Sequence, residues 1–183
     1  MNNIGILAYG SLIEDPGIEL KPLICERIED VETPFNIEFS RSSSSRDRAP
    51  TVVPVSGFGS PVKAIIMVLN ESVSLEKAKD LLWRRETRKE GSNKHYSDPQ
   101  NPSSNQVVVA KISELCGIEV VLYTQIGANI ENPTPQKLAT LAIESARSNA
   151  GSQGKDGISY LMSVKNQNES RGVRPSKVDN SSG

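Results

Sequence analysis

The sequence predicts one α+β domain in which a mixed or antiparallel sheet can close into a small barrel. Short apolar runs bounded by turn residues fill the first third of the chain, and a helical segment follows them. Two further apolar runs precede the last helices, so strands and helices do not alternate regularly and a doubly wound parallel sheet is not expected. With 183 residues, 36% of them hydrophobic, the chain is long enough to bury one core.

The first part of the chain predicts four strands. The apolar run 4–9 ends at a Gly-Ser pair, which is typical of a buried strand followed by a turn. Val, Thr, Phe, Ile and Phe at every second position of 31–39 indicate a half-buried strand, and Pro34 places it at an edge or breaks it. Residues 51–55 and 62–69 are strand-like on either side of a glycine-containing turn, which predicts a hairpin.

The rest of the chain predicts helices on either side of two more strands. Ser72 or Ser74 can cap a helix that reaches about Arg88. Residues 89–106 show no periodicity, which is typical of a lid or binding loop. The remaining expected elements are strands 107–112 and 118–126, a helix from Thr134 to near Gly151, and a short helix around 158–162.

Charge and hydropathy limit the partners of the domain, which we expect to span 1–173, with 174–183 as a polar C-terminal tail. The 21 basic and 22 acidic residues nearly balance, which argues against a dedicated nucleic-acid or anionic-membrane binder. The longest uninterrupted apolar run, Ala64 to Leu69, is too short to span a membrane. No signal peptide is visible at the N-terminus, so a cytoplasmic protein is expected.

Histidine and cysteine are too scarce for several kinds of site. The single histidine, His95, excludes zinc sites that need two or three histidines from one chain. Cys25 and Cys116 lie far apart in the sequence beside apolar neighbours. We therefore expect reduced, buried thiols rather than a disulfide or a catalytic thiol.

The first candidate site is Tyr9-Gly10-Ser11-Leu12, at the end of the first predicted strand. Glycine can adopt a positive φ and leave consecutive backbone N–H groups pointing into one concavity that binds an anion. An ordinary turn is the simpler interpretation of this pattern when it is taken alone.

The second candidate is Glu86, near the end of the predicted helix. On a helical wheel it falls close to the line of Leu75 and Leu82, so its side chain is expected at the flank of the apolar face. Loss of solvent would favour the neutral carboxyl and make Glu86 a stronger base than a free glutamate. The alternative is a solvated glutamate that pairs with Arg85 or Lys89.

A third feature is a pair of basic segments, Arg41–Arg48 and Arg84–Lys89. Together they can meet a phosphate or a carboxylate of a substrate. Four consecutive serines in the first segment and the balanced net charge favour a solvated loop instead.

Six motifs occur along the chain in an order that can be compared with known families. The motifs are Tyr9-Gly10-Ser11-Leu12, the apolar strand 62–69, Arg85-Glu86, the run 120–124, Asn132-Pro133-Thr134-Pro135 and Ser159-Tyr160-Leu161. In this order the chain resembles the gamma-glutamylcyclotransferase family, and more closely its ChaC-like branch, up to about Val173. The resemblance implies a mixed-sheet barrel with flanking helices around a central cavity.

The resemblance also implies an activity and a set of site residues. The family's enzymes convert a gamma-glutamyl compound, glutathione among the candidates, to 5-oxoproline by attack of its α-amine on its γ-carbonyl. Glu86 would be the base, and Tyr9, Gly10, Ser11, Leu12 and Tyr123 would bind the small-molecule substrate. No metal or cofactor is required, because the attacking and attacked groups belong to one molecule and a base must only free the amine.

Several alternatives stay open. The family's shorter branch places its glutamate before a glycine, as in Glu90-Gly91, but Glu90 follows the expected helix end and we favour Glu86. Thr87 stands where the ChaC-like branch has a lysine, and Ala64 where its strand has a glycine. The leaving group can be a dipeptide, a single amino acid or a polyamine. A non-catalytic metabolite-binding relative of the same fold is the alternative function, and the oligomeric state is undetermined.

Overall fold

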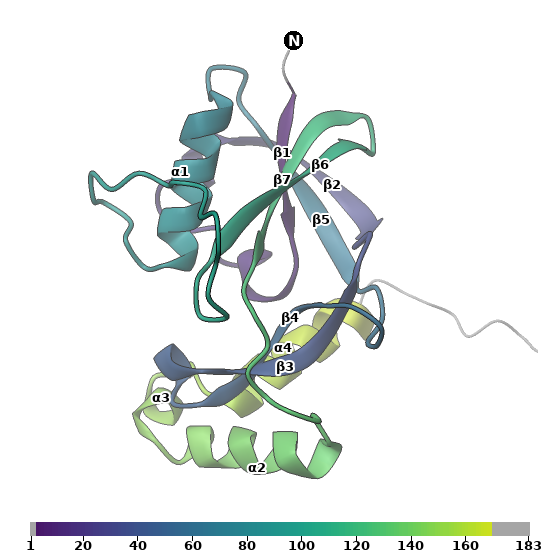
Figure 1. Cartoon of the computed structure of the whole chain (residues 1–183), viewed down its shortest axis with the longest axis vertical. Coiled ribbons are helices and arrows are strands. Elements are labelled where there is room, and N and C mark those ends of the chain that lie inside the picture. The colour runs from purple at the N-terminus through teal and green to yellow at the C-terminus, as the bar shows by residue number, and fades with distance from the viewer. Residues whose placement is uncertain (1–2, 170–183) are drawn as a thin grey trace, which may run out of the picture.

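The computed structural model describes residues 3–169 and shows a mixed α+β fold built around a five-stranded sheet (Figure 1). The expected domain boundary at Val173 and the tail 174–183 lie outside the described residues. The five strands run in the order β2-β5-β1-β7-β6, and β3 and β4 form a separate two-stranded ribbon. The strands are β1 Ile4–Ala8, β2 Ile24–Glu32, β3 Asn36–Ser43, β4 Ala49–Val55, β5 Lys63–Leu69, β6 Val108–Leu115 and β7 Ile118–Gln125. The α-helices are α1 Leu75–Glu86, α2 Pro135–Ala146, α3 Asn149–Ser152 and α4 Gly157–Glu169.

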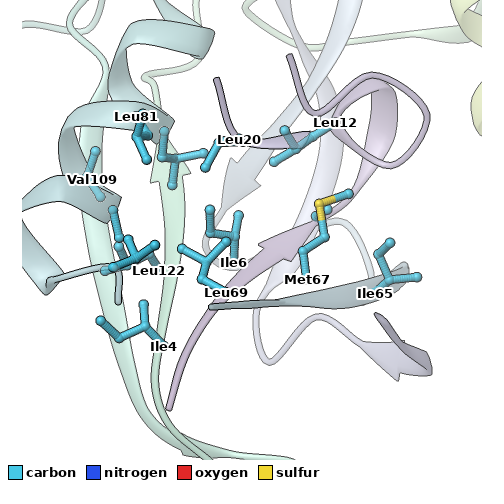
Figure 2. Close-up of a cluster of buried hydrophobic side chains, with 14 of the residues drawn as sticks. Ile4, Ile6, Leu12, Leu20, Ile65, Met67, Leu69, Leu81, Val109 and Leu122 are labelled. Carbon is cyan, nitrogen blue, oxygen red and sulfur yellow. The ribbon is translucent and has the colours of Figure 1, made fainter. Parts of the chain in front are cut away.

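Strand β1 lies at the centre of the sheet, antiparallel to β5 and parallel to β7. All five of its residues are buried, which explains why its sequence is continuously apolar rather than alternating. Ile4, Ile6 and Ala8 point to one face, where they join side chains of β5, β7 and α1 in the main core (Figure 2). Leu82 of α1 is fully buried in this cluster, so α1 covers this face of the sheet.

The opposite face of the sheet is also apolar, and the sheet curves around it without closing. Leu7 packs there with Ile66 and Val121, and side chains from both edge strands, Ile28 and Ile112, contact the same cluster. No hydrogen-bonded pairing joins β2 to β6 within residues 3–169, so the expected closed barrel is not found. The strands expected at 4–9, 62–69, 107–112 and 118–126 do lie in one sheet, as predicted.

Strand pairing differs from the prediction in two places. The segment 31–39 is not one strand, because the chain turns at Thr33, whose hydroxyl donates to Phe35 O at 2.8 Å. Residues 51–55 and 62–69 do not form a hairpin, since β4 pairs with β3 while β5 pairs with β1 and β2. The turn between β4 and β5 instead carries the chain from the ribbon back to the sheet.

The ribbon and the later helices form the other half of the molecule (Figure 1). Helices α2 and α4 both pack on β4 and on each other. Thr134 caps α2 through a hydrogen bond from Lys137 N, with Pro135 in the first helical position as predicted. Asp156 precedes α4 and accepts hydrogen bonds from Ile158 N and Ser159 N at 2.8 and 3.0 Å. Short polar caps therefore fix the ends of these helices.

The loop 89–106 is fastened to α1. Asp80 of α1 accepts hydrogen bonds from Tyr96 N and contacts His95 Nδ1, both at 2.6 Å. Arg84 donates to Lys94 O at 3.0 Å. The two cysteines are free but exposed, so their expected burial is wrong. Cys25 lies on the exposed edge strand β2, where apolar neighbours in the sequence do not imply a buried thiol.

Candidate functional site

A cavity of about 90 Å³ lies where the sheet half meets the ribbon half. Its lining comes from the end of β1, the ribbon strand β4, the end of α1, the end of β7 and the start of α4. The residues that line it are Leu7, Tyr9, Ser11, Leu12, Val52, Val53, Pro54, Arg85, Glu86, Thr124, Ile126 and Tyr160. The volume is below the roughly 300–1,000 Å³ of sites for drug-sized ligands, so it suits a group of about amino-acid size.

The turn after β1 is held in place by α4. Residues Gly10–Leu12 form a short 3-10 helix, which leaves its first N–H groups without acceptors inside the helix. Gly10 has a φ of 62°, and a Cβ atom added there would lie 2.9 Å from the hydroxyl oxygen of Tyr160. Gln167 of α4 donates to Gly10 O at 3.3 Å. Glycine is therefore required at position 10 both for its backbone angle and for the close approach of Tyr160.

Two tyrosines frame the cavity, Tyr160, which is buried, and Tyr9, which is partly buried. The hydroxyl of Tyr9 donates to Thr124 O at 3.0 Å. Burial raises the pKa of Tyr9 well above its usual range, and the negative charge of Glu86 raises it further. Burial also raises the pKa of Tyr160 to about 12, although a hydrogen bond with the backbone of Val52 and the charge of Arg46 oppose this shift. Both hydroxyls are protonated at neutral pH.

Glu86 is the last residue of α1 and lines the cavity together with Tyr9, Ser11 and Leu12. Its side chain is 24% exposed, and Oε1 accepts a hydrogen bond from Arg85 Nη1 at 2.6 Å. The same guanidinium is anchored on the loop after β1, because its Nε donates to Asp15 O at 3.0 Å. Arg85 therefore connects Glu86 to the segment that follows the Tyr9–Leu12 turn.

The rival glutamate, Glu90, does not line this cavity. Its Oε1 accepts a hydrogen bond from Glu19 N at 3.2 Å, and its side chain packs over Gly17. Glu90 is half-buried rather than exposed, and it holds the loop between β1 and β2 in place. The structure thus separates the two glutamates, with Glu86 at the cavity and Glu90 in a structural contact.

Two of the predicted substrate-binding residues are not part of the cavity lining. Gly10 lies directly beside it, against Tyr160. Tyr123 packs against the second apolar cluster, where its ring stacks on Phe35 at 4.6 Å and its hydroxyl accepts from Gln125 Nε2 at 2.8 Å. Its neighbour Thr124 lines the cavity instead.

Tyr160 and the β4 residues are cavity residues to which the sequence analysis gave no role, whereas Arg85 was expected only as part of a basic segment or as a partner of Glu86, with which it does pair. Tyr160 belongs to the Ser159-Tyr160-Leu161 motif and Arg85 to the Arg85-Glu86 pair, so the motifs contained a signal for both. No sequence signal marked Val52–Pro54, because these residues reach the site only through the β3–β4 pairing.

The comparisons with known proteins add no family assignment. No protein-family model matches the chain, and no curated protein matches it either. Within residues 3–169, no group of three or more histidine, cysteine, aspartate or glutamate side chains is arranged to hold a metal ion. None of the helices in the same part of the chain is long and apolar enough to cross a membrane.

Proposed function

We propose that this protein is a gamma-glutamylcyclotransferase-type lyase, with Glu86 as the base and the Tyr9–Leu12 turn as the cradle for the gamma-glutamyl group. One observation carries the proposal. The two motifs on which the sequence resemblance rests most, separated by more than 70 positions, line one small cavity. Random placement of two motifs does not bring a carboxylate and a glycine-containing turn to the same cavity of amino-acid size.

The chemistry needs a positioned substrate and one proton acceptor. Glu86 takes a proton from the α-ammonium group, and the freed amine attacks the γ-carbonyl carbon of the same molecule. The new C–N bond closes a five-membered ring, and the bond to the leaving nitrogen breaks. Overall the attacking nitrogen loses two protons and the leaving nitrogen gains two, so Glu86 returns to its starting form. Backbone N–H groups of the Tyr9–Leu12 turn stabilise the negative charge that develops on the carbonyl oxygen.

The neighbouring groups suit this chemistry. Tyr160 remains protonated at neutral pH, so its hydroxyl can donate a hydrogen bond beside Gly10. The Oε1 atom of Glu86 pairs with Arg85, while Oε2 accepts no hydrogen bond from any described residue. Oε2 is therefore the atom that can accept the proton of the substrate.

A second candidate function is a binding protein that holds a metabolite without turning it over. The observation that favours it is the 2.6 Å ion pair between Glu86 and Arg85. An arginine that stays bound occupies one oxygen of the carboxylate, so this pair must loosen if both oxygens are to reach the substrate. The same pair suits a site that only binds an ammonium group and a carboxylate.

The deciding experiment measures 5-oxoproline release by the pure protein from a panel of gamma-glutamyl compounds. We expect Glu86→Gln to lower turnover by roughly 10²- to 10⁴-fold, the usual contribution of a general base, because the amide keeps the shape but accepts no proton. Glu90→Gln is the matched control, since Glu90 lies outside the cavity lining. We expect it to retain turnover.

The outcomes separate the candidates. An active wild-type protein whose Glu90→Gln variant is inactive while Glu86→Gln is active would reverse the assignment of the base. Binding of gamma-glutamyl compounds without any 5-oxoproline would favour the metabolite-binding protein. Full activity in both variants would end the acid–base proposal.

A further inference from the structure

Three arginine side chains lie close to one another beside the cavity. Arg85 lines the cavity itself. The guanidinium of Arg46 lies 5.1 Å from the ring centre of Tyr160, which also lines the cavity. Arg88 follows just past the end of α1, and its Nη2 donates to Ser45 O at 3.3 Å, next to Arg46. The two basic segments of the sequence therefore meet here, from the β3–β4 turn and the end of α1.

Two of these charges have no acidic partner. The ion pairs among residues 3–169 join Lys79 to Asp98, Arg84 to Glu19, Arg85 to Glu86 and His95 to Asp80. Neither Arg46 nor Arg88 takes part in any of them. The negative charge of Asp156 opposes the lowering of the pKa of Arg46 by burial, but no ion pair joins the two side chains. The Asp156 carboxylate already accepts hydrogen bonds from Ile158 N and from the backbone and hydroxyl of Ser159.

Burial and mutual repulsion act on this cluster. Burial is the main reason that the pKa of Arg46 is lowered, and the positive charges of Arg88 and Arg85 lower it further. An anion placed between these groups would relieve the repulsion. Arg46 is half-buried and Arg88 is exposed, so both can be reached from solvent.

The backbone at Arg88 does not by itself assign a role to its side chain. Arg88 has a φ of 55° and stands just past the end of α1, where Lys89 N bonds to Arg84 O at 2.8 Å. Glycine is the residue that fits this left-handed helix end best. Arg48 has a similar φ of 65°, so a role for Arg88 follows from its place beside Arg46 and not from its backbone angle.

We propose that Arg46 and Arg88 bind a carboxylate on the leaving group of the substrate. This inference rests on the proposed function. A cavity of about 90 Å³ holds only the gamma-glutamyl end, so the leaving group must extend out of it. Arg46 contacts the ring of Tyr160, a lining residue, and Arg88 lies beside Arg46, so both are placed to meet a group that leaves the cavity on this side. Planar guanidinium groups match a carboxylate with paired hydrogen bonds. The substrate class is then a gamma-glutamyl amino acid or peptide with a free C-terminal carboxylate, whereas a polyamine would meet two like charges.

The test compares two probes that differ only in this carboxylate, gamma-glutamylglycine and gamma-glutamylglycinamide. Their affinities are measured by calorimetry on the full chain carrying Glu86→Gln, so that no turnover disturbs the measurement. We expect the acid to bind more tightly than the amide. Adding Arg46→Gln or Arg88→Gln should weaken binding of the acid by roughly 10- to 100-fold and leave the amide unchanged.

Arg48→Gln is the matched control, because Arg48 has the same charge two positions away but lines a separate surface hollow with Asp47 and Arg147. It should leave both affinities unchanged. Arg46 packs on Tyr160, so if its variant is misfolded, the exposed Arg88 variant decides alone.

Equal binding of the two probes, or a preference for the acid that persists in the Arg88→Gln variant, overturns the proposal. Tighter binding of inorganic phosphate, lost in the same variants, would overturn the carboxylate assignment. If the wild-type protein releases no 5-oxoproline but the acid still binds more tightly than the amide, the proposed lyase activity is wrong and the carboxylate site stands. If gamma-glutamylamines are turned over as fast as gamma-glutamylglycine, the lyase activity is kept and the carboxylate site is removed.

Discussion

The two halves of the molecule are stabilised in different ways. The sheet half, made of the five-stranded sheet and α1, contains both clusters of buried apolar side chains. The ribbon half, made of β3, β4 and the later helices, buries smaller apolar side chains such as Val53 and Ala142 and adds side-chain hydrogen bonds between its elements. Ser145 donates to Arg46 O at 2.7 Å, and Ser148 donates to Asp47 Oδ2 at 2.7 Å. Side chains of Arg41 and Asn129 add hydrogen bonds between the ribbon and the segment after β7.

The cavity lies at the border between the two halves. Close-packed apolar side chains leave few voids, and the two apolar clusters fill both faces of the sheet. At the border, the apolar residues Val52, Val53 and Pro54 of β4 face polar side chains of the sheet half, among them Arg85 and Glu86. The candidate site therefore takes Tyr9 and Glu86 from the sheet half and Tyr160 from the ribbon half.

The largest expected effect comes from removing core volume in the sheet half. Leu82→Ala deletes a fully buried side chain from the main cluster and should lower the free energy of unfolding by about 2–5 kcal/mol. Leu141→Ala, the matched change in α2 of the ribbon half, should cost less, because Leu141 is 9% exposed and belongs to neither cluster. Urea unfolding of both variants measures the difference. An equal or larger loss for Leu141→Ala would contradict the contrast between the halves.

A hydrogen-bond deletion in the ribbon half should have a smaller but clear effect. Ser145 is fully buried, and its hydroxyl donates to Arg46 O and accepts from Gly157 N at 3.1 Å. Ser145→Ala leaves both backbone groups unpaired and should cost about 1–3 kcal/mol in urea unfolding. Ser152→Ala, which removes an exposed hydroxyl from α3, is the control and should cost little. A neutral Ser145→Ala would show that water replaces these bonds and that the ribbon is not held by them.

The sequence predicted the sheet half better than the ribbon half for a physical reason. Strand β1 and helix α1 bury apolar faces, so their composition and periodicity reveal them locally. Strand β2 escaped prediction because most of its residues are exposed and charged, as suits an edge strand. The ribbon was misjudged because the break at Thr33 and the pairing of β4 with β3 depend on hydrogen bonds that no local pattern shows.

The sequence likewise predicted some residues of the candidate site and missed others. The helical wheel placed Glu86 beside the core, and the Gly-Ser pair marked the end of β1; both lie at the cavity. Tyr123 was expected to bind the substrate, but its neighbour Thr124 lines the cavity, and no local sequence pattern distinguishes these two positions. Tyr160 comes from an element remote in the sequence, and only the packing of α4 brings it to Gly10.

The smallest effect we predict is the excess cost of an alanine at position 10 over an alanine in an unhindered turn, which tests the contact between the halves directly. Gly10→Ala places a Cβ at a φ of 62° and 2.9 Å from the Tyr160 hydroxyl, so it combines a backbone cost with a steric one. Gly117→Ala, in the β6–β7 turn of the sheet half, has a φ of 80° and nothing within 4 Å, so it measures the backbone cost alone, about 1–2 kcal/mol.

We expect Gly10→Ala to cost more than Gly117→Ala in urea unfolding, and the excess to disappear in a Tyr160→Phe background, because that change removes the oxygen in the way. Gly117→Ala should cost the same with or without Tyr160→Phe, since its turn does not contact α4. Strictly additive losses for Gly10→Ala and Tyr160→Phe would mean that α4 moves away freely, and that the ribbon half does not fix the turn at the cavity. A coupling confined to position 10 would instead show that Tyr160 holds the Tyr9–Leu12 turn in the shape that the proposed chemistry needs.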